Sequence, residues 1–117
     1  MLAPLPPSTA LAGGLLIGTA ARVDEAAPTR NLDSHAARYR VDPAEHIRWN
    51  RVLRGTGRAV VGAYHSHPST AADPSPSDIA EASYPEFVYL IVSLGGAEPA
   101  LRAYRIADGI VAPLSLG

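Results

Sequence analysis

The chain has 117 residues, which fits one domain over residues 1–117 whose hydrophobic core can be stable without disulfide bonds or structural metal ions. It contains no cysteine, which excludes disulfide frameworks, thiolate zinc sites and cysteine nucleophiles, so any metal must bind through histidine and carboxylate side chains. Ten basic residues against eleven acidic ones give a net charge of −1 without a basic run, so we expect no nucleic-acid partner.

The N-terminal part predicts a lead-in followed by a strand. Residues 1–10, MLAPLPPSTA, have three prolines and no periodicity, and we expect them to be irregular. The apolar stretch from Leu11 to Ala21 lacks the preceding positive charge of a signal peptide and is interrupted by glycines. Its segment GGLLIGTA, from Gly13, predicts a buried strand. No segment has the roughly 20 apolar residues of a membrane span, so we expect no membrane association and a cytoplasmic protein.

The middle of the chain predicts extended structure and then a helix. The segment from Ala21 to Leu32 has no clear pattern and is a second strand or a hairpin arm. Tyr39 and Val41 alternate with arginines, as in a half-buried strand. Asp42 can cap a helix at about residues 43–54, because a proline follows at the first helical position and glycines follow the last.

One face of this predicted helix is apolar. Its apolar stripe comprises Ala44, Ile47 and Val52 or Leu53. We expect Trp49 to be a core residue or an anchor for a partner protein. His46 has no histidine partner three or four residues away and is expected to be a surface or capping residue.

The segment RAVVGAYHSH, from Arg58, predicts the strand that matters most for function. Its β-branched and aromatic content favours a strand, and the period of two places Val61, Ala63, His65 and His67 on one face. A loop over residues 68–74 follows. Ser75 then precedes a proline at the first position of a short helix, which Pro85 is expected to end.

Three strands are predicted in the remainder. The apolar run FVYLIVSL, from Phe87, is typical of a strand covered on both faces. ALRAYRIAD alternates apolar residues with arginines, and Asp108 with Gly109 predicts a turn into IVAPLSL. With two helices interleaved among the strands, the pattern indicates a single α/β domain.

The two histidines and a later aspartate can form a metal site. Side chains of His65 and His67 leave the strand on the same side, and Asp78 lies after a loop long enough to fold back onto them. Three protein ligands leave a fourth position for water, as in catalytic zinc sites. Two other interpretations stay open at this point: unrelated histidines, and a Ser75–Asp78 pair that only caps the helix.

The pattern His65-Ser66-His67-Pro68, then Ser75 and Asp78, resembles the signature of the JAMM (MPN+, prokaryotic JAB-type) zinc metallopeptidases. GGLLIG, RYRVDP and YLIVSL with PALRAYRI are similar to other segments of that family, so the resemblance covers most of residues 13–111. It implies an MPN-type domain: a curved mixed sheet packed with helices, layered as in cytidine deaminases.

The resemblance also implies a function. His65, His67 and Asp78 would hold one Zn²⁺ with a bound water, and Ser75 would help to hold the oxyanion. The reaction would be hydrolysis of a peptide or isopeptide bond in the C-terminal region of ubiquitin-like or sulfur-carrier proteins. The chain would then be a zinc-dependent protease, with a homodimer as a further possibility.

One element of the family pattern is absent. The family has a glutamate just before its first strand as proton shuttle, and this position falls on Leu11, with no acidic residue before Asp24. The catalytic base would then come from Glu25 or from a second subunit. Alternatively, Leu11, Ala10 or Ala12 stands where the native sequence has an acidic residue. The alternative function is a catalytically weak or inactive MPN domain that binds proteins and retains zinc.

Overall fold

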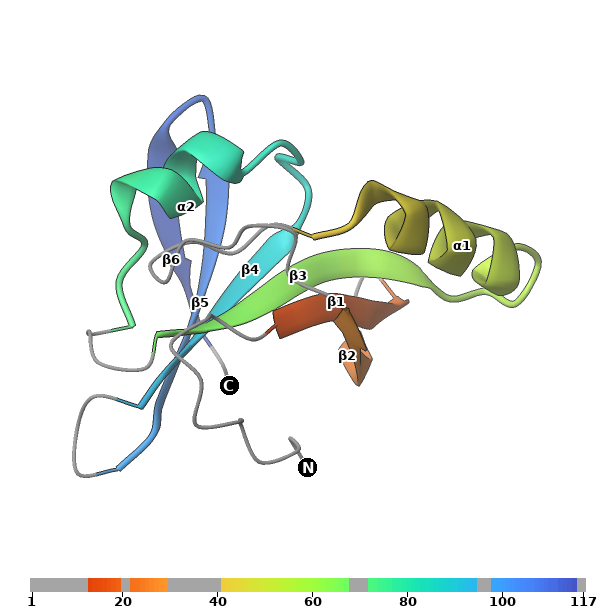
Figure 1. Ribbon diagram of the computed structural model, residues 1–117, viewed down its shortest axis with the longest axis horizontal. Coiled ribbons are helices and arrows are strands. Elements are labelled where there is room, and N and C mark those ends of the chain that lie inside the picture. Colours follow the sequence, from red (N-terminus) through yellow and green to blue (C-terminus); the bar gives the residue numbers. More distant parts are fainter. Residues whose placement is uncertain (1–12, 20–21, 30–40, 68–71, 95–97, 116–117) are drawn as a thin grey trace.

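The computed structural model describes residues 13–19, 22–29, 41–67, 72–94 and 98–115 (Figure 1). These residues form one mixed sheet with the strand order β2-β1-β3-β4-β5-β6. The strands are β1 (Gly13–Thr19), β2 (Arg22–Thr29), β3 (Ala59–His67), β4 (Val88–Ser93), β5 (Ala100–Ala107) and β6 (Ile110–Leu114). All neighbours are antiparallel except β3 and β4, which are parallel. The α/β class and the mixed sheet predicted from the sequence are confirmed.

Helix α1 (Pro43–Leu53) begins where the sequence predicts it. The carboxylate of Asp42 accepts a hydrogen bond from the backbone N–H of Ala44 at 2.9 Å, which satisfies one of the donors left open at a helix start. Gly55 and Gly57 follow the helix with φ of 80° and 81°, values that glycine adopts without steric cost. The helix end is therefore fixed by local sequence, as expected.

Helix α2 (Pro76–Glu81) lies in the connection between the parallel strands β3 and β4. Parallel neighbours require such a crossover, because the chain must return to the same end of the sheet. The prediction that Pro85 ends this helix was wrong in detail: the helix ends at Glu81, and the C-cap N–H of Ala82 bonds to the carbonyl of Ile79.

Both described helices cover the same face of the sheet, above it in Figure 1. Under α1, Trp49 packs against a buried cluster of Ile17, Ala27 and Leu53. Under α2, Ile79 packs against a second cluster of Ala72, Ile91, Tyr104 and Ile106. The described residues thus form a sheet with helices on one face, and the cytidine-deaminase-like layering stays a prediction.

Two sequence predictions of burial need correction. The apolar stripe of α1 is not buried along its length: Leu53 is buried, whereas Ile47 and Val52 are 53% and 59% exposed. The helix meets the sheet mainly through its second half, where Trp49 and Leu53 lie. Strand β4 was expected to be covered on both faces along its whole length. Its first three residues are only half-buried, and it is buried from Ile91 onward. The predicted strand at Tyr39 lies outside the described residues, although Val41 forms a single bridge.

The hairpin of β5 and β6 has the two-residue turn that the sequence predicts. Ala107 pairs with Ile110, which leaves Asp108 and Gly109 as the turn. Their φ angles are 51° and 77°, as a tight hairpin with right-handed twist requires. Neither described helix has the length and apolar character needed to cross a membrane.

Candidate metal centre

Strand β3 presents His65 and His67 on the helix-covered face of the sheet. His65 lies opposite Gly13 of β1 and Ile91 of β4, so the strand is held on both sides at this position. His67 is 6% exposed, and Ser66 between the two histidines is buried on the opposite face. The sequence prediction that both imidazoles point to one side of the strand is confirmed.

Gly62 allows β3 to approach β4 closely just before the histidines. Any Cβ at this position would collide with the carbonyl oxygen of Val88 in β4. Gly62 is also the residue that pairs with Val88 in the parallel ladder. The glycine therefore sets the strand spacing three residues before His65.

The start of α2 brings Asp78 to the histidines. The Ser75 hydroxyl accepts a hydrogen bond from the N–H of Asp78 at 3.1 Å, and the Ser75 N–H donates to Asp78 Oδ2 at 2.8 Å. This is a complete capping box, one of the two roles left open by the sequence. The same carboxylate also contacts both histidines, so capping and side-chain clustering occur together.

A buried tyrosine fixes the segment that precedes α2. The hydroxyl of Tyr104, on β5, donates a hydrogen bond of 2.7 Å to the carbonyl of Ala72. Ala72 and Tyr104 belong to the same core cluster, with Ile79 of α2 packed against it. This contact holds the N-terminal end of α2 over the sheet, and with it the carboxylate of Asp78.

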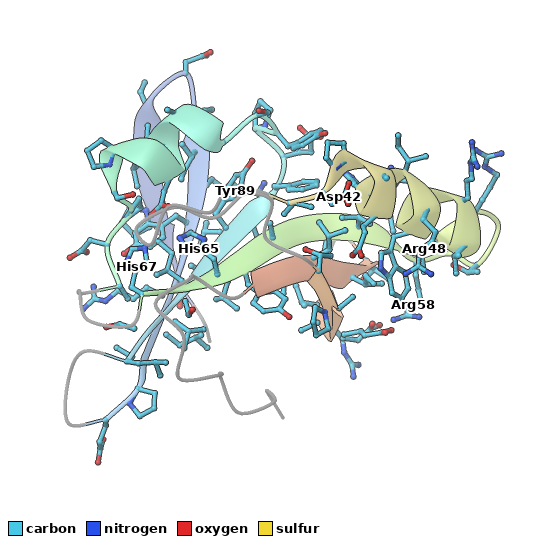
Figure 2. All side chains as sticks on the ribbon, in the orientation of Figure 1. Asp42, Arg48, Arg58, His65, His67 and Tyr89 are labelled. Carbon is cyan, nitrogen blue, oxygen red and sulfur yellow. The ribbon has the colours of Figure 1, made fainter. Side chains whose placement is uncertain are left out.

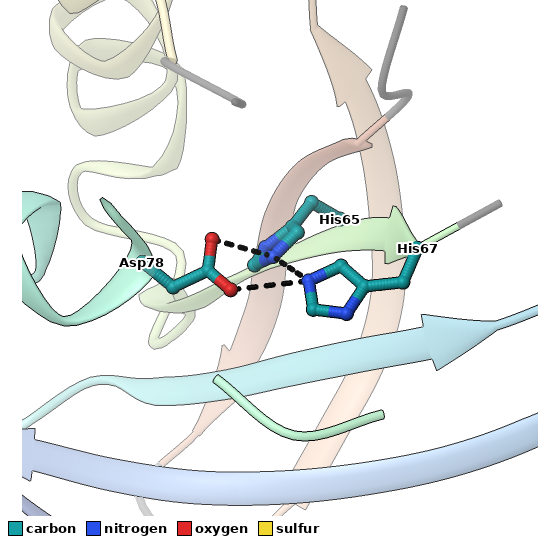
Figure 3. A group of neighbouring side chains, drawn as sticks. All are labelled: His65, His67 and Asp78. Atoms are coloured by element: carbon teal, nitrogen blue, oxygen red, sulfur yellow. Dashed lines mark hydrogen bonds and ion pairs between the residues drawn. The ribbon is translucent and has the colours of Figure 1, made fainter. Parts of the chain in front are cut away.

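Three donor groups converge at the end of β3 (Figure 3). The Nε2 atoms of His65 and His67 lie 3.2 Å apart, and each lies 3.1 Å from one carboxylate oxygen of Asp78. The three side chains are the one group among the described residues whose ligand atoms are close enough to hold a metal ion together.

The ionisation of Asp78 reflects this arrangement. Burial alone raises the pKa of the Asp78 carboxyl, but hydrogen bonds from His65 and His67 oppose it. The electrostatic interaction with His65 and the backbone N–H of Ser75 act in the same direction, so the net pKa of Asp78 lies well below its ordinary value. Asp78 is thus a carboxylate at neutral pH, the form that binds cations.

The donor set fits a zinc ion. Tetrahedral zinc has ligands at about 2.0–2.2 Å, which places neighbouring ligand atoms about 3.3 Å from each other. The two Nε2 atoms lie 3.2 Å apart, which is close to this value, and each lies 3.1 Å from a different oxygen of the Asp78 carboxylate. Two imidazoles and one carboxylate, without a fourth protein ligand among the described residues, also match the composition of an open rather than a closed zinc site.

Glu25, the weak candidate for the base, is not brought to this cluster. Its carboxylate pairs with Arg58 at 2.8 Å, and Asp24 pairs with the same guanidinium at 2.6 Å. Figure 2 shows Arg58 at the opposite end of β3 from the two histidines. In the sheet register Glu25 is level with Ile17 and Val60, five residues or about 16 Å from His65 along β3. Leu11 lies outside the described residues.

A groove leads from the cluster along the sheet. It has a volume of about 620 Å³ and lies over β1 and β3, between α1 and the segment over residues 83–89. His65 and Asp78 are part of its lining, together with apolar side chains such as Leu15 and Phe87. A groove that combines apolar side chains with convergent polar groups is typical of a ligand-binding site.

The groove also contains a residue whose role the sequence did not reveal. His46 was expected at the surface or at a cap, but its ring packs against Tyr84 and Phe87, with centroids 5.2 and 5.7 Å away. Burial lowers the pKa of His46. No local pattern could have indicated this contact, because Tyr84 and Phe87 lie 38 and 41 positions further along the chain.

Comparison with known families places this geometry in context. Residues 12–107 match the family of prokaryotic homologues of the JAB domain. The CysO-cysteine peptidase of Mycobacterium tuberculosis (strain ATCC 25618 / H37Rv) is 35% identical over 85 residues, which are 72% of this chain and 58% of that protein. The desampylase of Haloferax volcanii is 37% identical over 86 residues, 71% of this chain and 62% of that protein.

A solved structure agrees with the fold. The solution structure of a protein from Desulfitobacterium hafniense superposes with a TM-score of 0.79 and 32% sequence identity, over 91% of this chain and 76% of that one. The chain spans only about six-tenths of the length of the curated relatives described above.

Proposed function

Because this chain belongs to the family of prokaryotic homologues of the JAB domain, we propose that it is a JAMM-type zinc peptidase. The proposed substrates are proteins of the ubiquitin-like or sulfur-carrier class, cut at a peptide or isopeptide bond in their C-terminal region. The names of the relatives support this reaction class, since one is a CysO-cysteine peptidase and another a desampylase. The observation that carries the proposal is the convergence of His65, His67 and Asp78 at one end of a groove.

In this proposal each residue of the cluster has a defined role. His65 and His67 hold the metal through Nε2, and Asp78 holds it as a carboxylate. When bound, zinc polarises a substrate carbonyl and lowers the pKa of a coordinated water to about 7. The capping box fixes the orientation of Asp78, so the ligand geometry does not depend on a free side-chain rotation.

Ser75 is the proposed oxyanion donor. Its hydroxyl oxygen accepts the hydrogen bond from the N–H of Asp78, and a hydroxyl that accepts one bond still has its proton to donate. The cap holds this hydroxyl beside the ligand cluster. A donor fixed before the reaction stabilises the negative charge that develops on the carbonyl oxygen without reorganisation cost.

The proposed hydrolysis also needs a general base, and the cluster of His65, His67 and Asp78 does not supply one. A positioned base contributes about 10²- to 10⁴-fold to such a reaction. Glu25 is engaged by Arg58 at the far end of β3, which makes it a poor base. The leucine at position 11 therefore favours the second candidate function, a weak or inactive domain that binds its protein partner and retains zinc.

The test is cleavage of a ubiquitin-like sulfur carrier extended at its C-terminus. The zinc-loaded protein is expected to release the extension, a chelator to stop the release, and added zinc to restore it. Asp78→Asn should abolish cleavage, because the amide cannot replace the carboxylate as a charged ligand. A binding module would instead retain the carrier with measurable affinity and leave its tail intact.

A further inference from the structure

Two large apolar side chains remain exposed inside the groove. Ile47 is 53% exposed and Tyr84 is 42% exposed, and both belong to the groove lining. Val52, also on α1, is 59% exposed but does not line the groove. Exposed apolar side chains that face each other across a groove gain free energy when a ligand covers them.

These two side chains belong to one wall of the groove. We name this wall the aromatic end, and it comprises His46, Ile47, Tyr84, Glu86 and Phe87. Tyr84 and Phe87 stack with centroids 4.5 Å apart and planes at 22°, and His46 meets Tyr84 edge-on. The hydroxyl of Tyr89 accepts a hydrogen bond from the N–H of Tyr84 and donates one to its carbonyl, at 3.0 and 3.3 Å. The wall is therefore fixed by contacts within the chain.

The sheet register gives the distance from the aromatic end to the metal centre. Phe87 directly precedes Val88, which pairs with Gly62, three residues before His65 on β3. Val60, also in the lining, lies five residues before His65. At about 3.3 Å per residue, the aromatic end lies about 10–16 Å from His65, which an extended peptide spans with about three to five residues.

The charges of the groove limit which side chain fits there. Glu86 stands at the aromatic end and Asp78 at the metal centre, and the described lining contains no arginine. Arg105 donates to the backbone carbonyl of Glu86 at 2.8 Å but is not part of the lining. An acidic side chain in the groove would therefore lie beside the carboxylate of Glu86, which is unfavourable. An apolar side chain meets Ile47 and the aromatic rings instead.

We propose that the aromatic end is a specificity pocket for an apolar side chain in the tail of the substrate protein, about three to five residues before the scissile bond. Ile47 is the specificity-determining residue, because it is the most exposed apolar side chain of the wall. The inference rests on the proposed function, in which the bond that is cut lies in the C-terminal region of the carrier protein. The residues before that bond therefore belong to the tail of the carrier itself, and we assign the pocket to them.

The first experiment measures hydrolysis by the zinc-loaded protein. The substrates are tail peptides that end in a fluorogenic amide and carry leucine, glycine or aspartate at successive positions. At one position about four residues before the amide, the leucine peptide should have a kcat/KM about tenfold or more above that of the glycine peptide. The aspartate peptide should have a kcat/KM below that of the glycine peptide. Ile47→Ser should remove most of the preference for leucine, whereas Val52→Ser, which changes a similarly exposed residue on the same helix, should leave it intact.

The second experiment measures binding and needs no hydrolysis. A fluorescently labelled tail peptide that ends in a free carboxylate is titrated with each variant and followed by anisotropy. Weaker binding of the leucine peptide to Ile47→Ser than to Val52→Ser supports the pocket, whether or not any peptide is hydrolysed. If the peptides bind in this way but none is hydrolysed, the proposed function is refuted and the pocket is not. Equal affinities for leucine and glycine peptides, or equal effects of the two substitutions, would overturn the inference.

Discussion

Oδ2 of Asp78 lies 3.1 Å from Nε2 of His67, although the two residues are eleven positions apart in the chain. The start of α2 is held over the sheet by the Tyr104 hydroxyl, which donates to the carbonyl of Ala72. The position of one proposed ligand thus depends on a residue of β5 that does not touch the cluster.

Tyr104→Phe should therefore weaken metal binding without removing a ligand. Loss of the buried hydrogen bond is expected to lower the free energy of unfolding by about 1–2 kcal/mol and to reduce zinc affinity by about tenfold. Urea unfolding and a competition titration with a zinc chelator measure the two effects. Tyr89→Phe is the matched control, since it also loses hydrogen bonds of a tyrosine hydroxyl to the backbone, at Tyr84 rather than at Ala72. Equal zinc affinities of the two variants would contradict the positioning role of Tyr104.

The ligand assignment itself predicts a clear order of zinc affinities. His67→Ala and Asp78→Ala should each bind zinc more than about 100-fold more weakly than the unchanged protein, because each removes a ligand rather than a neighbour of one. Isothermal titration should give one ion per chain for the unchanged protein. His46→Gln, a histidine change outside the cluster, should retain full affinity. A zinc affinity insensitive to Asp78→Ala would show that the ion binds elsewhere.

Glu25→Ala should leave both zinc affinity and hydrolysis unchanged. The Glu25 carboxylate is paired with Arg58 at the far end of β3, and the same guanidinium keeps Asp24 as a second partner. The rate of tail cleavage over a range of pH checks the expectation. Loss, in Glu25→Ala, of the fall in rate at low pH, where a carboxylate base becomes protonated, would instead identify Glu25 as the base.

His46 should make the stability of the metal-free protein depend on pH. Burial lowers the pKa of His46 in the folded state, whereas the unfolded chain keeps the ordinary value near 6.5. Between these two values the unfolded state binds more protons, so the free energy of unfolding falls as the pH drops below about 6.5.

The comparison of the protein with His46→Gln isolates this effect. Tyr84 and Glu86 face the same groove and are present in both proteins, so their contributions cancel. Urea unfolding at about pH 7.5 and about pH 5 should show a smaller pH-dependent loss of stability in His46→Gln. An identical loss in both proteins would mean that His46 does not titrate differently on folding.

The parts of the site that follow from local rules could be predicted from the sequence. The period of two along a strand places His65 and His67 on one face, and a serine followed three residues later by an aspartate caps a helix. Both features depend on residues close together in the chain, so no knowledge of the tertiary structure was needed.

The groove could not be predicted, because it depends on contacts between distant segments. Whether Ile47 is buried is decided by the angle at which α1 meets the sheet, and the packing of Trp49 and Leu53 sets that angle. The burial of His46 depends on Tyr84 and Phe87, which reach it from the connection between α2 and β4. An amphipathic pattern does not contain this information.

The most direct test of the central claim is cleavage of a C-terminally extended sulfur carrier by zinc-loaded Leu11→Glu, beside the unchanged protein. Strand β1 enters the sheet with Gly13 opposite His65, two residues after position 11 in the chain. We expect Leu11→Glu to cleave about 10²- to 10⁴-fold faster than the unchanged protein, and a chelator or added Asp78→Ala to abolish cleavage in both. If zinc-loaded Leu11→Glu cleaves no carrier, or if cleavage survives Asp78→Ala, the cluster of His65, His67 and Asp78 is not a hydrolytic metal centre.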